Sequence, residues 1–289
     1  MKNSNPGASA GAIQHHYDVS NEFFKLWLDP TMSYSSALWA EDENETFEAA
    51  QLRKLDFHIN QARATGAQRV LDVGCGWGAI LRRLVETHGV KQAVGLTLSN
   101  AQAEWIASFN QPRLEVRIES WSDHAPTAPY DAIISIGAFE HFAKPNLAKP
   151  QRVQGYRKFF QFCHDWLKPG GWMSLETITY ENLRREEKSR FLEFEVYPES
   201  DLATLAEIAE ATERIFEIVA LRNDNEHAEH TWRIWLSALK ANRSAAIALV
   251  GKEIFDRYEK YLKFCIIDSH VANTAQVRIA LKRIDNPRP

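Results

Sequence analysis

A glycine-rich turn between an apolar run and a helical pattern constrains the fold of this chain more than any other feature. The apolar run at residues 70–73 ends at Gly74, and further glycines follow at Gly76 and Gly78. Residues 79–88 then have the apolar spacing of a helix. A strand that leads into a helix through such a turn presents backbone N–H groups and a helix N-terminus to a ligand. The turn therefore predicts a ligand site at the end of a strand in an open α/β sheet.

Strand and helix patterns alternate on both sides of this turn. Strand-length apolar runs occur at residues 93–96, 114–118, 130–137 and 172–177, and helical spacing occurs at 49–65, 100–109 and 156–167. Such alternation is typical of βαβ units and predicts an α/β fold with a mainly parallel, doubly wound sheet. The alternation stops after residue 178. Helical patterns follow at residues 181–195, 202–211, 231–240 and 245–264, and the last strands are predicted at 216–221 and 276–282. Residues 180–210 are thus an expected helical insertion before the last strands.

Composition and charge exclude several classes of protein. The 34 Lys and Arg residues are balanced by 38 Asp and Glu residues without a long basic stripe, so we expect no nucleic-acid partner. The three cysteines are far apart and lack CxxC spacing, which predicts neither a disulfide framework nor a metal site. The first residues lack an apolar signal segment, and no later run has the length of a membrane span. We therefore expect a cytoplasmic protein with no integral membrane association.

The spacing of the glycine turn separates two classes of cofactor. Gly74, Gly76 and Gly78 form a GxGxG pattern, whereas dinucleotide-binding turns have GxGxxG, whose third glycine would fall at Ala79. That fingerprint tolerates alanine, so an NAD-dependent dehydrogenase stays an alternative. A strand-to-helix connection that binds no ligand is a further alternative.

Several sequence blocks together resemble one known family. In chain order they are His16-Tyr-Asp-Val-Ser-Asn-Glu-Phe-Phe24, residues 29–35, Leu71-Asp-Val-Gly-Cys-Gly-Trp-Gly78, and residues 95–99, 135–141 and 235–239. They resemble a family of S-adenosylmethionine (SAM)-dependent methyltransferases, the cyclopropane-fatty-acid synthases, which include enzymes like the mycolic acid cyclopropane synthases. The resemblance implies a Rossmann-like class I SAM methyltransferase fold in one domain over residues 1–289. Residues 1–48 would form an N-terminal lid, 66–178 the SAM-binding core, and 180–210 the insertion that lines the acceptor pocket.

The resemblance also implies which residues bind SAM and its product S-adenosylhomocysteine (SAH). The glycines of the turn would admit the amino-acid end of SAM close to the backbone, as glycine permits. Tyr34 and Ser35 would fold over the cofactor from the N-terminal lid. The other cofactor-binding residues that the resemblance implies are Asp72, Gly74, Gly76, Gly78, Thr97, Gln102, Trp121, Ser122 and Ile136. The aromatic residues among them have the alternative of packing in the core.

The catalytic residues of the resembled family are only partly kept. Those enzymes hold a bicarbonate ion with a Cys, a Glu, a His and a Tyr, and the matching positions of this chain are Ser36, Glu140, Glu176 and Ala228. A second carboxylate would repel bicarbonate, so we expect none. Two neighbouring carboxylates raise the pKa of one of them, and Glu176 is the expected general base, with Glu140 and His141 as catalytic partners. The alternatives are an ion pair of Glu176 with an Arg or Lys, and a purely structural His141.

These features predict a SAM-dependent methyltransferase of EC class 2.1.1 that acts on a small-molecule acceptor, with Tyr17 and Ser36 binding the acceptor. The expected target is an electron-rich carbon, as in an indole or alkene, or an amine nitrogen of a small specialised metabolite. The charged residues 184–190 favour a small acceptor over a long acyl chain. The alternatives are cyclopropanation or methylation of an unsaturated fatty acyl chain, and a SAM-binding subunit without activity. We expect a monomer or a homodimer.

Overall fold

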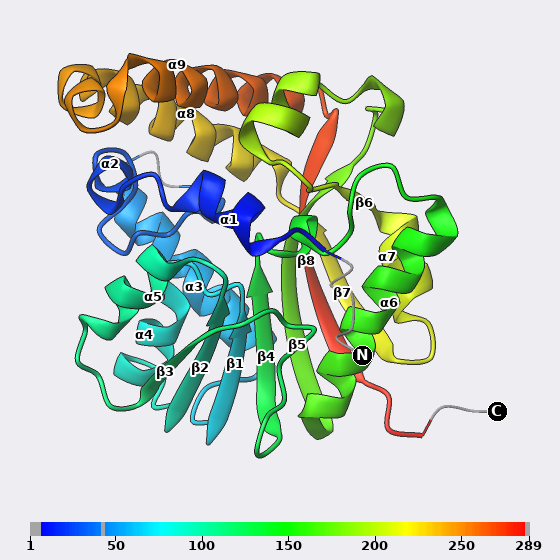
Figure 1. The fold of residues 1–289 in the computed structure, drawn as a ribbon. Coiled ribbons are helices and arrows are strands. Elements are labelled where there is room, and N and C mark those ends of the chain that lie inside the picture. The colour runs from blue at the N-terminus through cyan, green and yellow to red at the C-terminus, as the bar shows by residue number, and fades with distance from the viewer. Residues whose placement is uncertain (1–6, 42–43, 287–289) are drawn as a thin grey trace.

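A mixed sheet forms the centre of the protein, whose computed structural model describes residues 7–41 and 44–286 (Figure 1). Within these residues the strand order is β3-β2-β1-β4-β5-β8-β7, and β6 pairs with β5. The strands are β1 (Arg69–Val73), β2 (Gln92–Thr97), β3 (Leu114–Ile118), β4 (Tyr130–Ile136), β5 (Leu167–Tyr180), β6 (Ala203–Thr204), β7 (Phe216–Asn223) and β8 (Thr274–Arg283). Only β8 runs antiparallel to its neighbours, β5 and β7, among these described strands. The predicted mainly parallel, doubly wound sheet is confirmed.

Helices cover both faces of this sheet. The helices are α1 (Ala10–Tyr17), α2 (Asn21–Lys25), α3 (Phe47–Gln61), α4 (Ala79–Glu86), α5 (Asn100–Ala107), α6 (Lys149–Trp166), α7 (Leu205–Thr212), α8 (Asn225–Ala241) and α9 (Arg243–His270). On one face, Ile59, Leu81 and Ile106 from α3, α4 and α5 share a buried apolar cluster with the strands. On the other face, Phe160 of α6 and Ile208 of α7 belong to a second such cluster. Burial of apolar side chains on both faces stabilises the layers.

A third apolar cluster forms a cap beyond the carboxyl ends of the parallel strands. Phe24 of α2, Trp235 of α8 and Leu262 of α9 belong to it, and Figure 1 shows α8 and α9 above the sheet. The sequence accounts for α8, because its buried residues recur at helical spacing on one side. They are Ala228, Thr231, Trp232, Trp235 and Leu239. The cap therefore places aromatic side chains over the edge of the sheet where ligands bind in α/β folds.

Two segments differ from the prediction. β5 begins at Leu167 rather than at residue 172, because Leu167 already pairs with Tyr130 of β4. The helix expected at residues 181–195 is also wrong: the chain forms a 3₁₀ turn at Arg185–Glu187 and a π-helical turn at Leu192–Val196. Arg185 in this segment forms ion pairs with Asp201 and Glu207, which are more distant in the sequence than the neighbours it would have in a helix.

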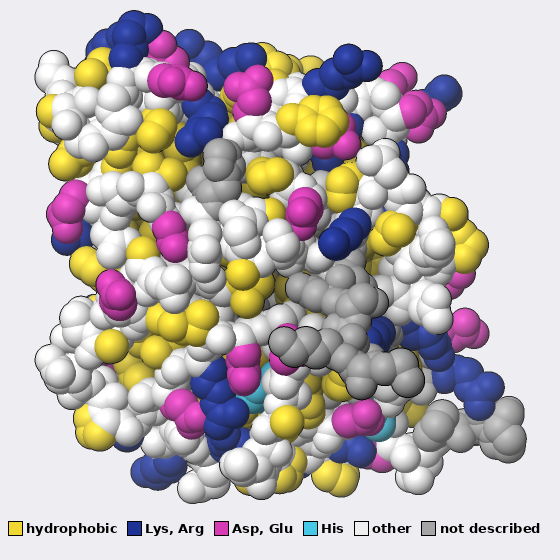
Figure 2. Space-filling view, viewed as in Figure 1, with side chains coloured by type: hydrophobic (Ala, Val, Ile, Leu, Met, Phe, Trp, Pro, Cys, Tyr) yellow, Lys and Arg dark blue, Asp and Glu magenta, His cyan; other side chains and the backbone are white. Residues whose placement is uncertain are grey.

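The surface carries charges of both signs. On the face in Figure 2, Lys and Arg side chains are interspersed with Asp and Glu. None of the helices in the described part of the chain has the length and apolar character needed to cross a bilayer.

Candidate active site

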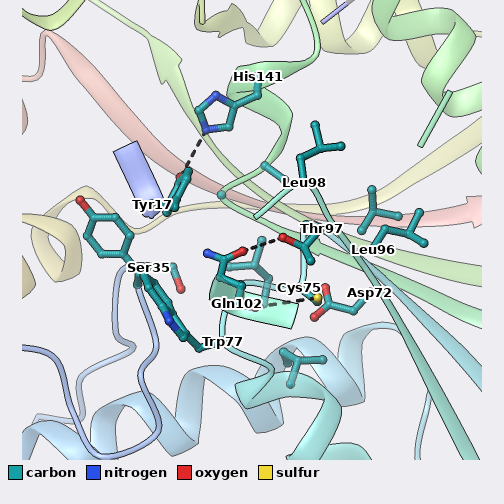
Figure 3. A pocket seen from close by; sticks show the side chains of 18 of the residues that line it. Tyr17, Ser35, Asp72, Cys75, Trp77, Leu96, Thr97, Leu98, Gln102 and His141 are labelled. Atoms are coloured by element: carbon teal, nitrogen blue, oxygen red, sulfur yellow. Dashed lines mark hydrogen bonds between the residues drawn. The ribbon is translucent and has the colours of Figure 1, made fainter. Parts of the chain in front are cut away.

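A cavity of about 140 Å³ lies beyond the carboxyl ends of β1, β2 and β4, and we call it the strand-end cavity (Figure 3). Its wall includes most of the residues that the sequence analysis assigned to the cofactor: Tyr34, Ser35, Asp72, Gly74, Gly76, Thr97, Gln102, Trp121 and Ile136. Gly78 and Ser122 adjoin lining residues but do not line the cavity themselves. The strand ends thus bring together segments that are far apart in the sequence.

The glycine turn after β1 has a backbone that other residues rarely adopt. Gly74 has a φ of 80°, and a Cβ atom there would lie 2.3 Å from the Cβ of Ala138. Gly76 has a φ of 52°, and a Cβ atom there would meet no protein atom within 4 Å. Gly74 is therefore required for packing, and Gly76 leaves the backbone open on the side where it lines the cavity.

Two buried charged groups border the strand-end cavity. Burial raises the pKa of Asp72 to about 7, although nearby Lys54 opposes this rise. Lys54 reaches the cavity from α3 and donates a hydrogen bond of 2.7 Å to the Oγ of Ser35. Burial lowers the pKa of Lys54 to about 8. Sequence reasoning missed Lys54, although a lysine on the apolar face of α3 was a usable signal.

The end of β2 offers neutral hydrogen-bonding groups to the cavity. Thr97 donates to the Oε1 of Gln102 over 2.7 Å, as Figure 3 shows. Trp121 both lines the cavity and packs in the core, where its ring centroid is 5.4 Å from that of Phe159. The two readings of Trp121 are therefore compatible.

A larger cavity of about 430 Å³ lies between the sheet and the cap, and we call it the cap cavity. Its apolar and aromatic lining comes from the insertion and from α8 and α9, and it includes Leu183, Leu192, Tyr197, Trp232, Trp235, Tyr261 and Phe264. The two cavities share part of their wall, which consists of Tyr17, Tyr34, Ser35, Gly137 and His141. A group that passes from one cavity to the other must cross between these residues.

Glu140 lines the cap cavity directly beside the shared wall. It lies in the 3₁₀ turn Phe139–His141 and is 8% exposed. Its Oε1 accepts a hydrogen bond of 2.6 Å from the backbone N–H of Ile178, and its Oε2 has no hydrogen-bond partner among the described residues. Burial raises the pKa of Glu140 to about 7, and the charge of Glu176 adds to this rise. Such a carboxylate can take up a proton near neutral pH.

The surroundings of Glu176 shift its pKa in the opposite direction to that of Glu140. Its Oε2 accepts hydrogen bonds from the Nε of Arg278 over 2.7 Å and from the Nε2 of His58 over 2.9 Å. Burial raises its pKa, but Arg278 and His58 outweigh burial, and the pKa of Glu176 is lowered to about 2. The expectation of a raised pKa at Glu176 is therefore wrong. The role of general base stays a prediction that this ion pair does not support, because a carboxylate held ionised by Arg278 is a weak base. The alternative, an ion pair with an arginine, describes what is found.

The positions that match the bicarbonate ligands of the resembled family do not fit that ion. Ser36 is fully buried, its hydroxyl donates to the carbonyl of Ala37, and it lines neither cavity, so its position does not support the predicted contact with the acceptor. Ala228 lines the cap cavity but has no hydrogen-bonding side chain. The remaining two positions are the carboxylates Glu140 and Glu176. Two carboxylates would repel a carbonate ion, since like charges at short range disfavour each other.

Tyr17 and His141 form a hydrogen-bonded pair in the shared wall. The Oη of Tyr17 and the Nε2 of His141 are 3.3 Å apart (Figure 3). The Nδ1 of His141 is 2.6 Å from the Oγ of Ser200. Burial lowers the pKa of His141 to about 4, so this imidazole is neutral at physiological pH. Neutral His141 orients Tyr17 through a hydrogen bond.

The residues that line the strand-end cavity fit SAM. The open backbone at Gly76 admits a close approach, and the carboxyl group of Asp72 can accept a hydrogen bond from an amino group. The indole of Trp121 offers an apolar face to a purine.

Comparisons with known proteins agree with this geometry. The sequence model of mycolic acid cyclopropane synthetases matches residues 5–277. Cyclopropane mycolic acid synthase 3 of Mycobacterium tuberculosis (strain ATCC 25618 / H37Rv) is 36% identical over 273 residues, which cover 88% of this chain and 91% of that protein. Cyclopropane mycolic acid synthase 1 of the same strain is 35% identical over 271 residues, covering 88% of this chain and 90% of that protein.

Solved structures give the same result. The cyclopropane synthase MmaA2 from Mycobacterium tuberculosis superposes with a TM-score of 0.86 at 32% identity, covering 97% of this chain and 100% of the other. Mycolic acid cyclopropane synthase CmaA1, complexed with SAH and CTAB, also has a TM-score of 0.86, at 31% identity and with coverages of 96% and 99%. The chain belongs to the mycolic acid cyclopropane synthetase family and is a SAM-dependent enzyme of the methyltransferase type with a class I fold.

Proposed function

We propose that this enzyme transfers a methyl group from SAM to a carbon–carbon double bond of an apolar acceptor in the cap cavity, and that Glu140 accepts the proton that is lost. The names of the relatives support an unsaturated acyl chain as this acceptor. Among the alternatives of the sequence analysis, they support acyl-chain cyclopropanation or methylation more than an indole or an amine. The apolar lining of the cap cavity also suits a hydrocarbon chain.

The observation that carries the proposal is the position of Glu140 next to the shared wall. SAM fits one side of this wall, and the acceptor would lie on the other. The only carboxylate near the wall with a pKa raised to about 7, among the described residues that line the cap cavity, is Glu140. A methyl transfer needs alignment of the two reactants, and reactants in two cavities that share a wall would lie next to each other.

The proposed reaction requires one proton acceptor. Bound SAM supplies an electrophilic methyl group, and SAH leaves with the electron pair of the broken carbon–sulfur bond. The π electrons of the acceptor form the new carbon–carbon bond, which leaves a positive charge on the neighbouring carbon. Glu140 stabilises this charge and removes a proton, and the released electron pair closes a cyclopropane ring or forms a new double bond. The aromatic rings of Tyr17, Trp232 and Trp235 offer π faces to the same charge.

Labelled SAM tests this proposal directly. We would incubate the enzyme with methyl-labelled SAM and dispersions of dioleoyl phospholipid, dipalmitoyl phospholipid, an indole panel or an amine panel. Label in the unsaturated lipid and none in the saturated lipid is the expected result. Label only in an indole or an amine would contradict the proposed acceptor.

The variant Glu140→Gln tests the proposed base. We expect its turnover to fall by about 10²-fold or more, the usual scale for losing a general base, while SAH affinity measured by calorimetry is unchanged. Glu195→Gln is the matched control, because Glu195 is an exposed carboxylate of the insertion. Equal turnover in both variants would remove Glu140 from the mechanism.

A further inference from the structure

Two residues of the shared wall, Tyr34 and Ser35, belong to a largely buried chain segment without regular secondary structure. Residues 32–40, which we call the wall segment, form neither helix nor strand, yet Met32, Ser33, Ser36, Ala37 and Leu38 are buried. Buried backbone groups need hydrogen-bond partners, and a segment without a helix or strand must find them elsewhere. The partners of the wall segment therefore determine where Tyr34 and Ser35 lie between the two cavities.

Side chains from two helices supply part of these partners. From α3, the Nε2 of Gln51 donates to the carbonyl of Ser35 over 2.9 Å. From α8, the Oγ1 of Thr231 accepts a hydrogen bond of 3.1 Å from the backbone N–H of Ala37. The Nδ1 of His227 accepts one of 3.1 Å from the N–H of Trp39.

Arg278 of β8 is a further partner, and it brings a positive charge to the backbone of the wall segment. Its Nη2 donates to the carbonyls of Ser36 and Ala37 over 3.0 and 3.3 Å. Its Nε bonds Glu176, and its Nη1 donates to the Oδ2 of Asp224 over 2.6 Å. The side chain is fully buried, and all three of its nitrogens are used. A planar guanidinium can serve three directions at once, which an ammonium cannot do with the same fixed geometry.

We propose that Arg278 is a positioning residue of the active site, which fixes the wall segment and thereby the Tyr34–Ser35 portion of the wall between the cofactor and the acceptor. Glu176 and Asp224 are the counter-ions that hold the guanidinium in place. Glu176 therefore acts through Arg278 and takes no proton in the reaction. This inference does not depend on the identity of the acceptor or on the role of Glu140.

The variant Arg278→Lys tests the inference, because lysine keeps the positive charge but lacks the planar guanidinium with its three hydrogen-bonding nitrogens. Arg222→Lys is the matched control: Arg222 also bonds Asp224, with its Nη2 at 2.8 Å, but it has no hydrogen bond or ion pair with the described residues of the wall segment, and its side chain is 47% exposed. We would measure SAH affinity by calorimetry and amide hydrogen exchange of residues 37–39 by mass spectrometry. For Arg278→Lys we expect a dissociation constant for SAH about tenfold higher, as for a lost hydrogen bond to a charged group, and faster exchange.

The control separates positioning from simple stabilisation. A purely structural Arg278 would lower the melting temperature without changing SAH affinity or exchange at residues 37–39 relative to Arg222→Lys, and this result would overturn the inference.

A second variant keeps the inference testable if Arg278→Lys does not fold. Thr231→Val removes the acceptor for the N–H of Ala37 and leaves every charge in place. Faster exchange at Ala37 together with weaker SAH binding supports the inference. Faster exchange with unchanged SAH binding contradicts it, because the wall segment would then have no influence on the cofactor site.

Discussion

Two glutamates at one site show how strongly surroundings decide the chemistry of a residue. Glu140 and Glu176 are close enough for the charge of one to raise the pKa of the other. Glu140 accepts hydrogen bonds from neighbouring backbone N–H groups and from Thr177 but faces no cation among the described residues, so burial dominates and its pKa rises to about 7. Glu176 receives Arg278 and His58, so its pKa falls to about 2. The residue type alone predicts neither outcome, because the partner Arg278 lies 102 positions away in the sequence.

The pH dependence of turnover follows from Glu140. A general base must be ionised, so the rate at saturating SAM and acceptor should rise with pH through about 7. The groups that face Glu140 do not titrate there, since Glu176 is ionised, His141 is neutral and Tyr17 has a pKa above its usual range. Asp72 has a pKa of about 7 as well, but it borders the cofactor, and saturating SAM removes its influence on binding. A flat profile between pH 6 and 8, read as about a twofold change or less, would refute this assignment.

The same raised pKa affects stability. The folded protein holds the Glu140 proton up to about pH 7, whereas an unfolded Glu releases it near 4.5, so stability falls as pH rises through this window. Glu140→Gln removes this cost. We expect its free energy of unfolding to exceed that of the wild type by about 1–3 kcal/mol at pH 8 and to equal it at acidic pH, as urea titrations would show. A variant less stable than the wild type at pH 8 would contradict this expectation, because contacts of the Glu140 carboxylate would then offset the free-energy cost of its burial.

The turn after β1 has positive φ angles at Gly74, Gly76 and Gly78, a backbone conformation that glycine adopts readily. Gly74→Ala should lower the free energy of unfolding by more than about 2 kcal/mol and abolish SAH binding, because the new methyl group overlaps Ala138 and its φ is strained. Gly66→Ala is the control: Gly66 has a similar φ of 74° with no atom within 4 Å of the added Cβ, so only the strain of about 1 kcal/mol is expected. Equal losses in both variants, by thermal and SAH titrations, would refute the close packing of the turn.

The pairing of β5 with β8 places Glu176 directly opposite Arg278. Glu176→Gln leaves Arg278 with Asp224 as its counter-ion and should lower the free energy of unfolding by about 3 kcal/mol, because a buried ion pair loses one partner. Turnover per folded molecule should stay within about threefold, since glutamine can still accept a hydrogen bond from Arg278. A fall in turnover as large as that of Glu140→Gln, with normal SAH affinity, would restore Glu176 as the base.

At the scale of the whole molecule, local patterns predicted the architecture and long-range contacts determined the site. The glycine turn, the strand alternation and the helical spacing of α8 are local, and the doubly wound sheet follows from them. The wall segment has no such pattern: the side chains that hold Ser35, Ser36 and Ala37 come from α3, α8 and β8. An arginine in the apolar run of β8 was a signal for a buried ion pair, but the sequence did not show which carboxylate it would reach.

In the proposed reaction Glu140 accepts the proton in place of the bicarbonate ion that the resemblance implied for this family. The rate of methyl incorporation into dioleoyl phospholipid, measured in carbonate-free buffer and again with added bicarbonate, tests whether Glu140 acts alone. Equal rates are predicted, because Glu140 needs no partner ion. A rate that collapses without bicarbonate and recovers when it is added would contradict the claim.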